Sequence, residues 1–136
     1  MSRIKDKVEE IEKYIQELFE IIPLDFKEYE SEFKTKAACE RYFEKIVEAM
    51  SDLSFLIIKE KKLKQPEEEE NVFEILMNNN IISRDLAERF KKAKGMRNIL
   101  SHQYGNIDDE VVFDSITKEL QKDVNEFIEI ITKLIS

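Results

Sequence analysis

The feature that most constrains the fold of this chain is the spacing of its apolar residues, which recur every third or fourth position. Near the start they stand at Ile4, Val8, Ile11, Ile15, Leu18 and Ile22. This spacing draws one apolar stripe along an α-helix, whereas a half-buried strand would alternate apolar and polar residues. Pro23 ends this first predicted helix, because proline lacks the N–H that would continue it.

The same spacing predicts four further helices. A long one starts near Ala38 and fades in the basic run at 59–65, and a short one follows the junction formed by Pro66 and Glu67–Glu70. A fourth is capped by Ser83 and stops at Gly105 and Asn106. The last is capped by Asp108 or Asp109 and runs to Leu134. The segment 24–35 reads as a connection with at most an early turn of helix. We therefore predict an all-α, antiparallel bundle of about five helices, in one domain spanning 1–136.

Charge and cysteine content narrow the class of protein. The net charge is −8, which disfavours a general nucleic-acid binder. The window from Arg84 to Arg97 is different, because it holds six basic residues against two acidic ones, a local charge of +4. Cys39 is the only cysteine and stands in a helical stripe, so we expect a buried, inert thiol and a reducing, cytoplasmic setting. No run is apolar enough for a signal peptide or a membrane span.

The stretch whose side chains could carry out a reaction is RNILSHQY, from Arg97 to Tyr104, which contains the only histidine of the chain. Arginine offers a planar fork of donors to a phosphate, and histidine exchanges protons near neutral pH. With Asn98 to orient or donate, these groups suit RNA cleavage without a metal: a base activates the ribose 2′-hydroxyl, an acid protonates the leaving oxygen, and Arg97 stabilises the phosphorane. We expect no metal and no cofactor, because one histidine and one cysteine make a poor ligand set.

Helix geometry limits how this stretch acts. On one continuous helix, Arg97 and Tyr104 are about 20° apart, whereas Arg97 and His102 are about 140° apart. The side chains of Arg97 and His102 therefore meet only if the helix unwinds at Ser101 to Gly105 or if a second subunit brings its own copy alongside. Gly95 stands inside a helical pattern. Either the helix tolerates this glycine without a function for it, or a partner subunit approaches the backbone closely there. The plainer interpretation makes His102 a favourable cation near a helix C-terminus and Arg97 the partner of a carboxylate.

The motif and its flanks resemble one family. RNILSHQY, preceded by KAACERYFEKIVEAMSDL and set within VFEILMNNNIISRDLAERFKKAKGMRNILSHQYGNIDDEVVFDSI, is similar to the HepT-like toxins of the HEPN superfamily over most of the chain. The resemblance implies a symmetric homodimer with a composite, metal-independent ribonuclease site across the dimer. In this family pattern Arg97 and His102 map to the nuclease residues, and Asn98 maps to the supporting polar position.

The resemblance also implies a partner and a control point. It implies a prokaryotic, type VII-like toxin–antitoxin pair, in which an MntA-like antitoxin of nucleotidyltransferase fold transfers AMP to the motif tyrosine, here Tyr104. The basic residues Arg89, Lys91, Lys92 and Lys94 are the expected contacts for RNA, either tRNA or mRNA. The alternative is a non-catalytic dimeric module that binds a nucleotide or a partner and scaffolds a nucleotidyltransferase.

Overall fold

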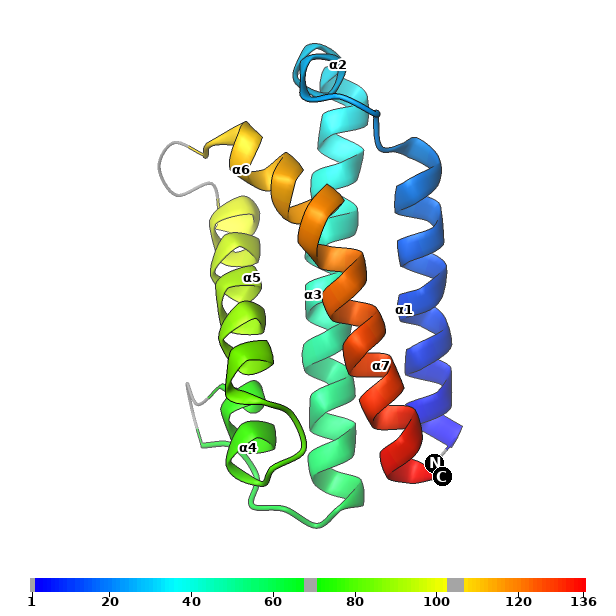
Figure 1. Ribbon diagram of the computed structural model, residues 1–136, viewed down its shortest axis with the longest axis vertical. Coiled ribbons are helices and arrows are strands. Elements are labelled where there is room, and N and C mark those ends of the chain that lie inside the picture. Colours follow the sequence, from blue (N-terminus) through cyan, green and yellow to red (C-terminus); the bar gives the residue numbers. More distant parts are fainter. Residues whose placement is uncertain (1, 68–70, 103–106) are drawn as a thin grey trace.

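The computed structural model describes residues 2–67, 71–102 and 107–136. Its long helices run alternately up and down (Figure 1). Helix α1 (Ser2–Ile21) rises, α3 (Phe33–Glu60) descends, α5 (Arg84–His102) rises again, and α7 (Gln121–Ile135) returns to the end where the chain began. The predicted all-α antiparallel bundle is confirmed.

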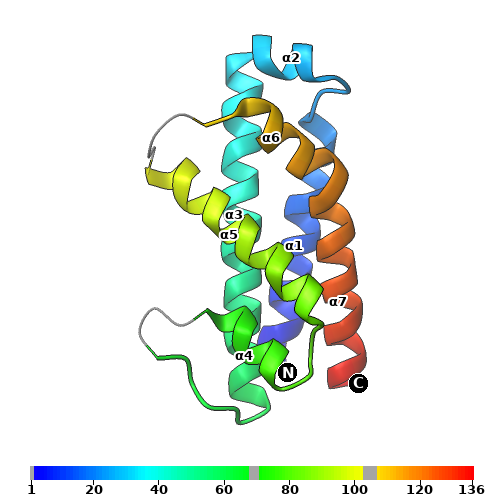
Figure 2. The ribbon, with the colours of Figure 1, turned by 60° about the vertical axis from the view of Figure 1, so that its left-hand side comes forward.

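Short helices close the two ends of the bundle. Helix α2 (Phe26–Ser31) lies over the top of α3, next to α6 (Asp109–Asp114), and α4 (Val72–Asn78) packs at the opposite end. In Figure 2, α5 crosses the long helix α3 obliquely. Counting α6 to α7 as one continuous helix gives six helical units among the described residues, one more than predicted. The additional unit is α2, which the Asp25 side chain caps by accepting a hydrogen bond from the Glu28 N–H at 2.8 Å.

Several helices begin at the capping residues that the sequence predicted. The Ser83 hydroxyl accepts a hydrogen bond from the Leu86 N–H at 3.1 Å, so it caps α5 as expected. Asp108 caps α6 by accepting from Glu110 and Val111. Helix α4 begins at Val72, where the side chain of Asn71 caps it, so it follows the junction as predicted. Of that junction, residues 68–70 fall outside the described residues. The expected stop at Gly105 and Asn106 falls outside the described residues.

The last helix contains a π-helical segment, η1 (Ser115–Leu120), between α6 and α7. Its apolar residues repeat at strict intervals of four, at Val112, Ile116, Leu120 and Val124, and all four are buried. In a regular α-helix this spacing would turn the stripe by about 40° at each step. The wider i→i+5 turn of a π-helix removes this drift, so the stripe keeps facing the core.

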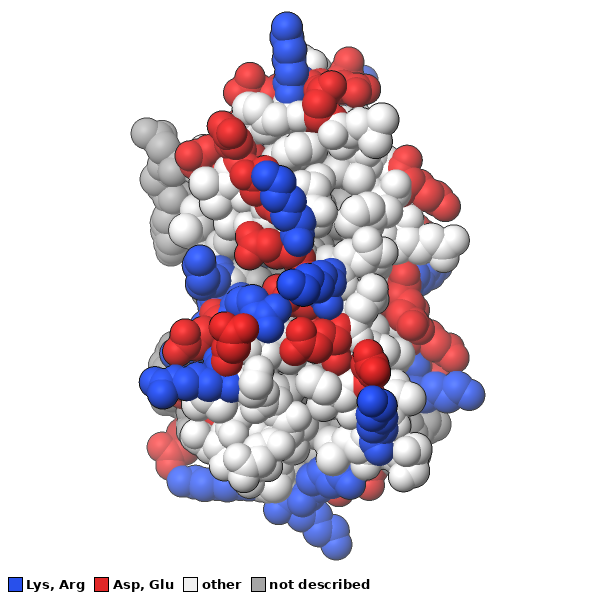
Figure 3. Space-filling view, viewed as in Figure 1, with Lys and Arg blue, Asp and Glu red and all other residues white. Residues whose placement is uncertain are grey.

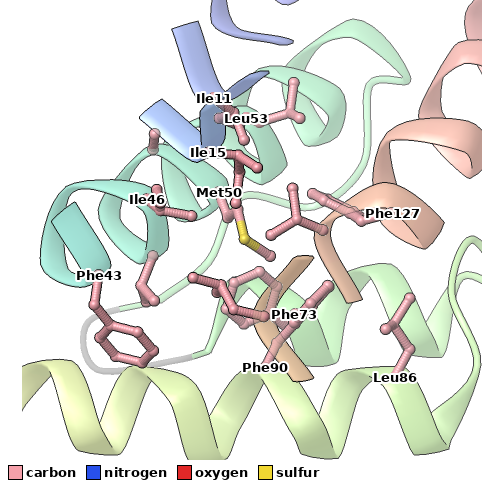
Figure 4. Close-up of a cluster of buried hydrophobic side chains, with 14 of the residues drawn as sticks. Ile11, Ile15, Phe43, Ile46, Met50, Leu53, Phe73, Leu86, Phe90 and Phe127 are labelled. Carbon is pink, nitrogen blue, oxygen red and sulfur yellow. The ribbon is translucent and has the colours of Figure 1, made fainter. Parts of the chain in front are cut away.

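The core lies along α3 and is formed by one apolar face from each long helix (Figure 4). Ile11 and Ile15 of α1 meet Met50 and Leu53 of α3, and all four are buried. A chain of aromatic rings then connects α4, α5 and α7. Phe73 lies 5.0 Å from Phe90 between ring centroids, and Phe90 lies 5.2 Å from Phe127. These contacts fix α5, which carries the candidate site, against the rest of the bundle.

Candidate functional site

The motif lies on the C-terminal half of α5, which stays regular through His102. Because the helix is unbroken between Arg97 and His102, the two side chains leave it about 140° apart, as expected for 3.6 residues per turn. Helix α5 is therefore not unwound at Ser101 or His102, and the rest of the stretch where unwinding was considered, 103–105, falls outside the described residues. Tyr104 lies outside the described residues, as do Gln103, Gly105 and Asn106.

Arg97 points inward, toward α3. Its Nη2 donates to the Glu48 carboxylate at 3.3 Å, and its Nη1 donates to the Asn98 side-chain oxygen at 3.1 Å. The Arg97 side chain is 28% exposed, and its buried Nε finds no hydrogen-bond partner among the described residues. The plainer sequence interpretation, a pairing of Arg97 with a carboxylate, thus holds within the protomer. Asn98 lies beside the guanidinium, where a supporting residue is expected.

A second link joins the same two helices one turn further along. The Ser101 hydroxyl donates to the Glu44 carboxylate at 2.9 Å, and Arg41 also donates to Glu44 at 3.3 Å. Glu44 and Glu48 are one turn apart on α3, and Ser101 and Arg97 are one turn apart on α5. The two antiparallel helices are therefore held in register by two side-chain links.

Neither glutamate stands out in the sequence as a site residue. They stand among core positions of α3 at a spacing of four, which on its own describes one edge of any amphipathic helix. What singles them out is the partner across the helix interface. That partner depends on how α5 packs against α3, which the spacing within one helix does not encode.

Gly95, Ile99 and His102 share the outward side of α5. Ile99 and His102 lie within about 40° of Gly95 around the helix. A Cβ built on Gly95 meets no atom within 4 Å, and Ile99 is 41% exposed. Within the protomer, therefore, no neighbour requires a glycine at position 95. Of the two interpretations, close approach by another molecule is the one that still gives the glycine a function.

The four predicted RNA contacts differ in their surroundings. Arg89 is held by Asp123, with Asp85 at 3.2 Å and Glu126 at 3.7 Å, and its side chain is 26% exposed. Burial raises the pKa of the Asp123 carboxyl, and the Arg89 guanidinium opposes that shift. Because three carboxylates already compensate its charge, Arg89 has the surroundings of a structural residue rather than of an RNA contact.

Lys91 and Lys92 are exposed, and Lys94 is half-buried. Lys91 pairs with Glu74 at 2.7 Å, and the charges of Lys92 and Lys94 form no ion pair with the other described residues. Figure 3 shows blue and red side chains intermixed on the face seen in Figure 1, with no uniformly basic patch there. Carboxylates from other helices thus partly neutralise the positive charge of the window from Arg84 to Arg97.

A cavity of about 320 Å³ lies between α5 and the neighbouring helices. Its walls are mostly apolar and come from α3, α4, α5 and the last helix, and they include Phe43, Met50, Phe73, Phe90 and Met96. The Arg89–Asp123 ion pair lies on its wall, whereas Arg97 and His102 are not among the lining residues. The candidate site and the cavity are therefore separate features of α5.

No group of three or more histidine, cysteine, aspartate or glutamate side chains is arranged to hold a metal ion within the described ranges. None of the helices in that part of the chain is long and apolar enough to cross a membrane.

Comparison with known proteins identifies the family. Residues 11–131 match the family model described as Ribonuclease HepT-like. The mRNA nuclease HepT of Shewanella oneidensis is 25% identical over 128 residues, covering 94% of this chain and 95% of the relative. The tRNA nuclease HepT of Aphanizomenon flos-aquae is 31% identical over 121 residues, covering 88% of this chain and 81% of the relative.

The solved structures agree with this assignment. The tri-AMPylated Shewanella oneidensis HEPN toxin, in complex with MNT antitoxin, superimposes with a TM-score of 0.88 at 25% identity and covers 96% of each chain. The HEPN-like fold and the ribonuclease class, both predicted from the resemblance, are thereby confirmed. The chain belongs to the HepT-like ribonuclease family.

Proposed function

We propose that this chain is the ribonuclease toxin of a prokaryotic, type VII-like toxin–antitoxin pair and acts on RNA in the cytoplasm. We further propose that residues 1–136 form a single HepT-like HEPN domain that works as a symmetric homodimer. The observation that carries the proposal is the intact set Arg97, Asn98 and His102 on one unbroken helix. The relatives described as mRNA and tRNA nucleases support RNA as the substrate.

The dimer follows from the divergence of the catalytic pair. Within one protomer, Arg97 turns toward α3 while His102 leaves the opposite side of the helix. A second copy related by a two-fold axis would place its own α5 against this helix and combine residues from both chains. Gly95 would permit the close approach, and the exposed Ile99 would supply apolar contact.

The proposed reaction is cleavage by attack of the ribose 2′-oxygen on the adjacent phosphorus. The 2′-hydroxyl gives up its proton to a base, and the P–O5′ bond breaks as an acid protonates the leaving oxygen. His102 and its copy in the second subunit supply these two proton-transfer roles. Arg97 stabilises the negative charge of the phosphorane, and Asn98 orients the guanidinium. The products are a 2′,3′-cyclic phosphate and a 5′-hydroxyl.

Control by an antitoxin completes the proposal. A structural relative is an AMPylated HEPN toxin in complex with an MNT antitoxin. By analogy, an MntA-like nucleotidyltransferase would transfer AMP from ATP to the Tyr104 hydroxyl and release pyrophosphate. The adduct would add bulk and negative charge two residues from His102, and so exclude RNA. A Tyr104→Phe variant should remain toxic when the antitoxin is co-expressed. If the antitoxin silences this variant as well as the parent, AMP transfer to Tyr104 is not the control.

The central test is RNA cleavage by the unmodified protein and its His102→Ala variant, with a chelator present. Bulk tRNA and an mRNA transcript are the substrates, and mass spectrometry first confirms that no AMP is attached. We expect the parent to leave 2′,3′-cyclic phosphate ends and the variant to lose cleavage while remaining a dimer by light scattering. An inactive parent that still binds nucleotide or antitoxin would instead favour the non-catalytic scaffold, in which the pairing of Arg97 with Glu48 is purely structural.

A further inference from the structure

Two carboxylates of α3 meet the motif end of α5, and nothing in the family resemblance assigns them a role. Glu48 accepts a hydrogen bond from Arg97 Nη2 at 3.3 Å, and Glu44 accepts one from Ser101 at 2.9 Å. Since each pair is one helical turn from the other, Glu44 sets the register of the helices. Glu48 then acts directly on the guanidinium of the proposed catalytic arginine.

The hydrogen bonds of Arg97 leave a defined edge of the guanidinium for a ligand. Nη2 is bonded to Glu48, Nη1 is bonded to Asn98, and the buried Nε has no partner among the described residues. Each terminal nitrogen keeps a second N–H, because a guanidinium carries five N–H donors in a rigid fork. The Glu48 side chain is 53% exposed, so this ion pair lies at the surface, within reach of a bound polymer.

We propose that Glu48 is a positioning residue for Arg97: its carboxylate holds the guanidinium so that the remaining N–H groups meet the scissile phosphate of RNA. This inference rests on the proposed ribonuclease function and adds a residue to it. Glu48 acts through Arg97 and exchanges no proton with the substrate. The fixed orientation matters because a small misplacement of a charge-stabilising group weakens its contact with the transition state far more than with the ground state.

The same carboxylate has an opposing effect on substrate binding. Its negative charge lies beside the position where an RNA phosphate must bind, so it repels the ground-state substrate. The proposal therefore predicts that the two kinetic constants separate. Loss of the hydrogen bond lowers kcat, whereas loss of the charge lowers KM. A residue that only stabilised the fold would not produce this separation.

Two substitutions distinguish the hydrogen bond from the charge. Glu48→Gln keeps an oxygen that accepts from Arg97 but removes the charge, so kcat should stay within about threefold of the parent while KM falls about threefold. Glu48→Ala removes both, so kcat should fall at least about tenfold without a rise in KM. Asp52→Asn is the matched control. Asp52 lies on the same helix with 54% exposure and pairs with Lys7 at 3.7 Å, away from the motif, so both constants should match the parent.

Two kinetic results would overturn the proposal. If Glu48→Gln is as inactive as Glu48→Ala, the carboxylate itself exchanges the proton and Glu48 is not a positioning residue. If Glu48→Ala retains the parent kcat, the link to Arg97 has no catalytic role. Thermal unfolding of each variant shows whether a loss of activity comes from a loss of folding.

A second readout separates this proposal from the ribonuclease function. In ¹⁵N spectra, a guanidinium held by hydrogen bonds rotates slowly and gives resolved Nη signals, which an Arg97→Lys variant assigns to Arg97. We expect these signals in the parent and in Glu48→Gln but not in Glu48→Ala. If the parent cleaves no RNA, the proposed function fails whatever the spectra show. If RNA is cleaved but the Arg97 signals are unchanged in Glu48→Ala, Glu48 does not hold the guanidinium and this inference alone fails.

Discussion

Phe90 is the residue through which the core fixes the helix that carries the site. It is 2% exposed and lies at the middle of a three-ring chain, between Phe73 of α4 and Phe127 of α7 (Figure 4). Replacing Phe90 with alanine removes both ring contacts and enlarges the cavity that Phe90 already lines. Replacing it with leucine keeps most of the apolar volume but loses both aromatic contacts.

The size of each effect follows from the burial. A buried Phe→Ala change costs about 3–5 kcal/mol, and each aromatic contact contributes about 1 kcal/mol beyond its buried area. We therefore expect a loss of about 4 kcal/mol in the free energy of unfolding for Phe90→Ala and about 2 kcal/mol for Phe90→Leu. Since domains of this size are stable by about 5–15 kcal/mol, both variants should fold at low temperature.

Urea denaturation followed by far-UV circular dichroism measures both changes, because the chain contains no tryptophan for a fluorescence assay. With a slope near 2 kcal/mol per molar urea, the midpoint should fall by about 2 M for Phe90→Ala and about 1 M for Phe90→Leu. Phe55→Ala is the control, since Phe55 is 44% exposed and should change the midpoint much less. All samples need one protein concentration, because dimerisation would make the midpoint depend on it. Equal midpoint shifts for Phe90→Ala and Phe55→Ala would refute this account of the core.

Three further predictions concern other parts of the chain. Burial raises the pKa of the Cys39 thiol to about 11, and its side chain is fully buried, so a disulfide reagent at pH 8 should label it only after unfolding; labelling of the native protein would contradict this. Gly95→Arg should convert the proposed dimer to monomer in light scattering while the protomer stays folded, since the Cβ of the new side chain meets no neighbour within the protomer; a persisting dimer would place the interface elsewhere. Asp108→Ala removes the cap of α6 and should lower the free energy of unfolding by about 1 kcal/mol, measurable by the same urea assay.

Much of the fold could be predicted because a helix is specified locally. The apolar stripes located α1, α3, α5 and the last helix, and the side chains of Ser83 and Asp108 marked two of their starts. Helix α2 was missed because six residues are too few to show a period. The π-helical turn was missed because strict intervals of four also fit an α-helical stripe. Packing against the core, which the spacing does not describe, requires the stripe to stay on one side of the helix instead of rotating around it.

The candidate site, like the fold, could be predicted only in part. By itself, the sequence determined the motif and its chemistry, because residue identity fixes which groups carry a guanidinium, an amide or an imidazole. It also determined the divergence of Arg97 and His102, because helical geometry follows from spacing alone. The packing of the helices, in contrast, sets Arg97 opposite Glu48 and Ser101 opposite Glu44, and it brings Asp123 to compensate the charge of Arg89. These partners are brought together by the packing of α5 against α3 and of α5 against α7, and no local pattern records which residues two packed helices place opposite each other.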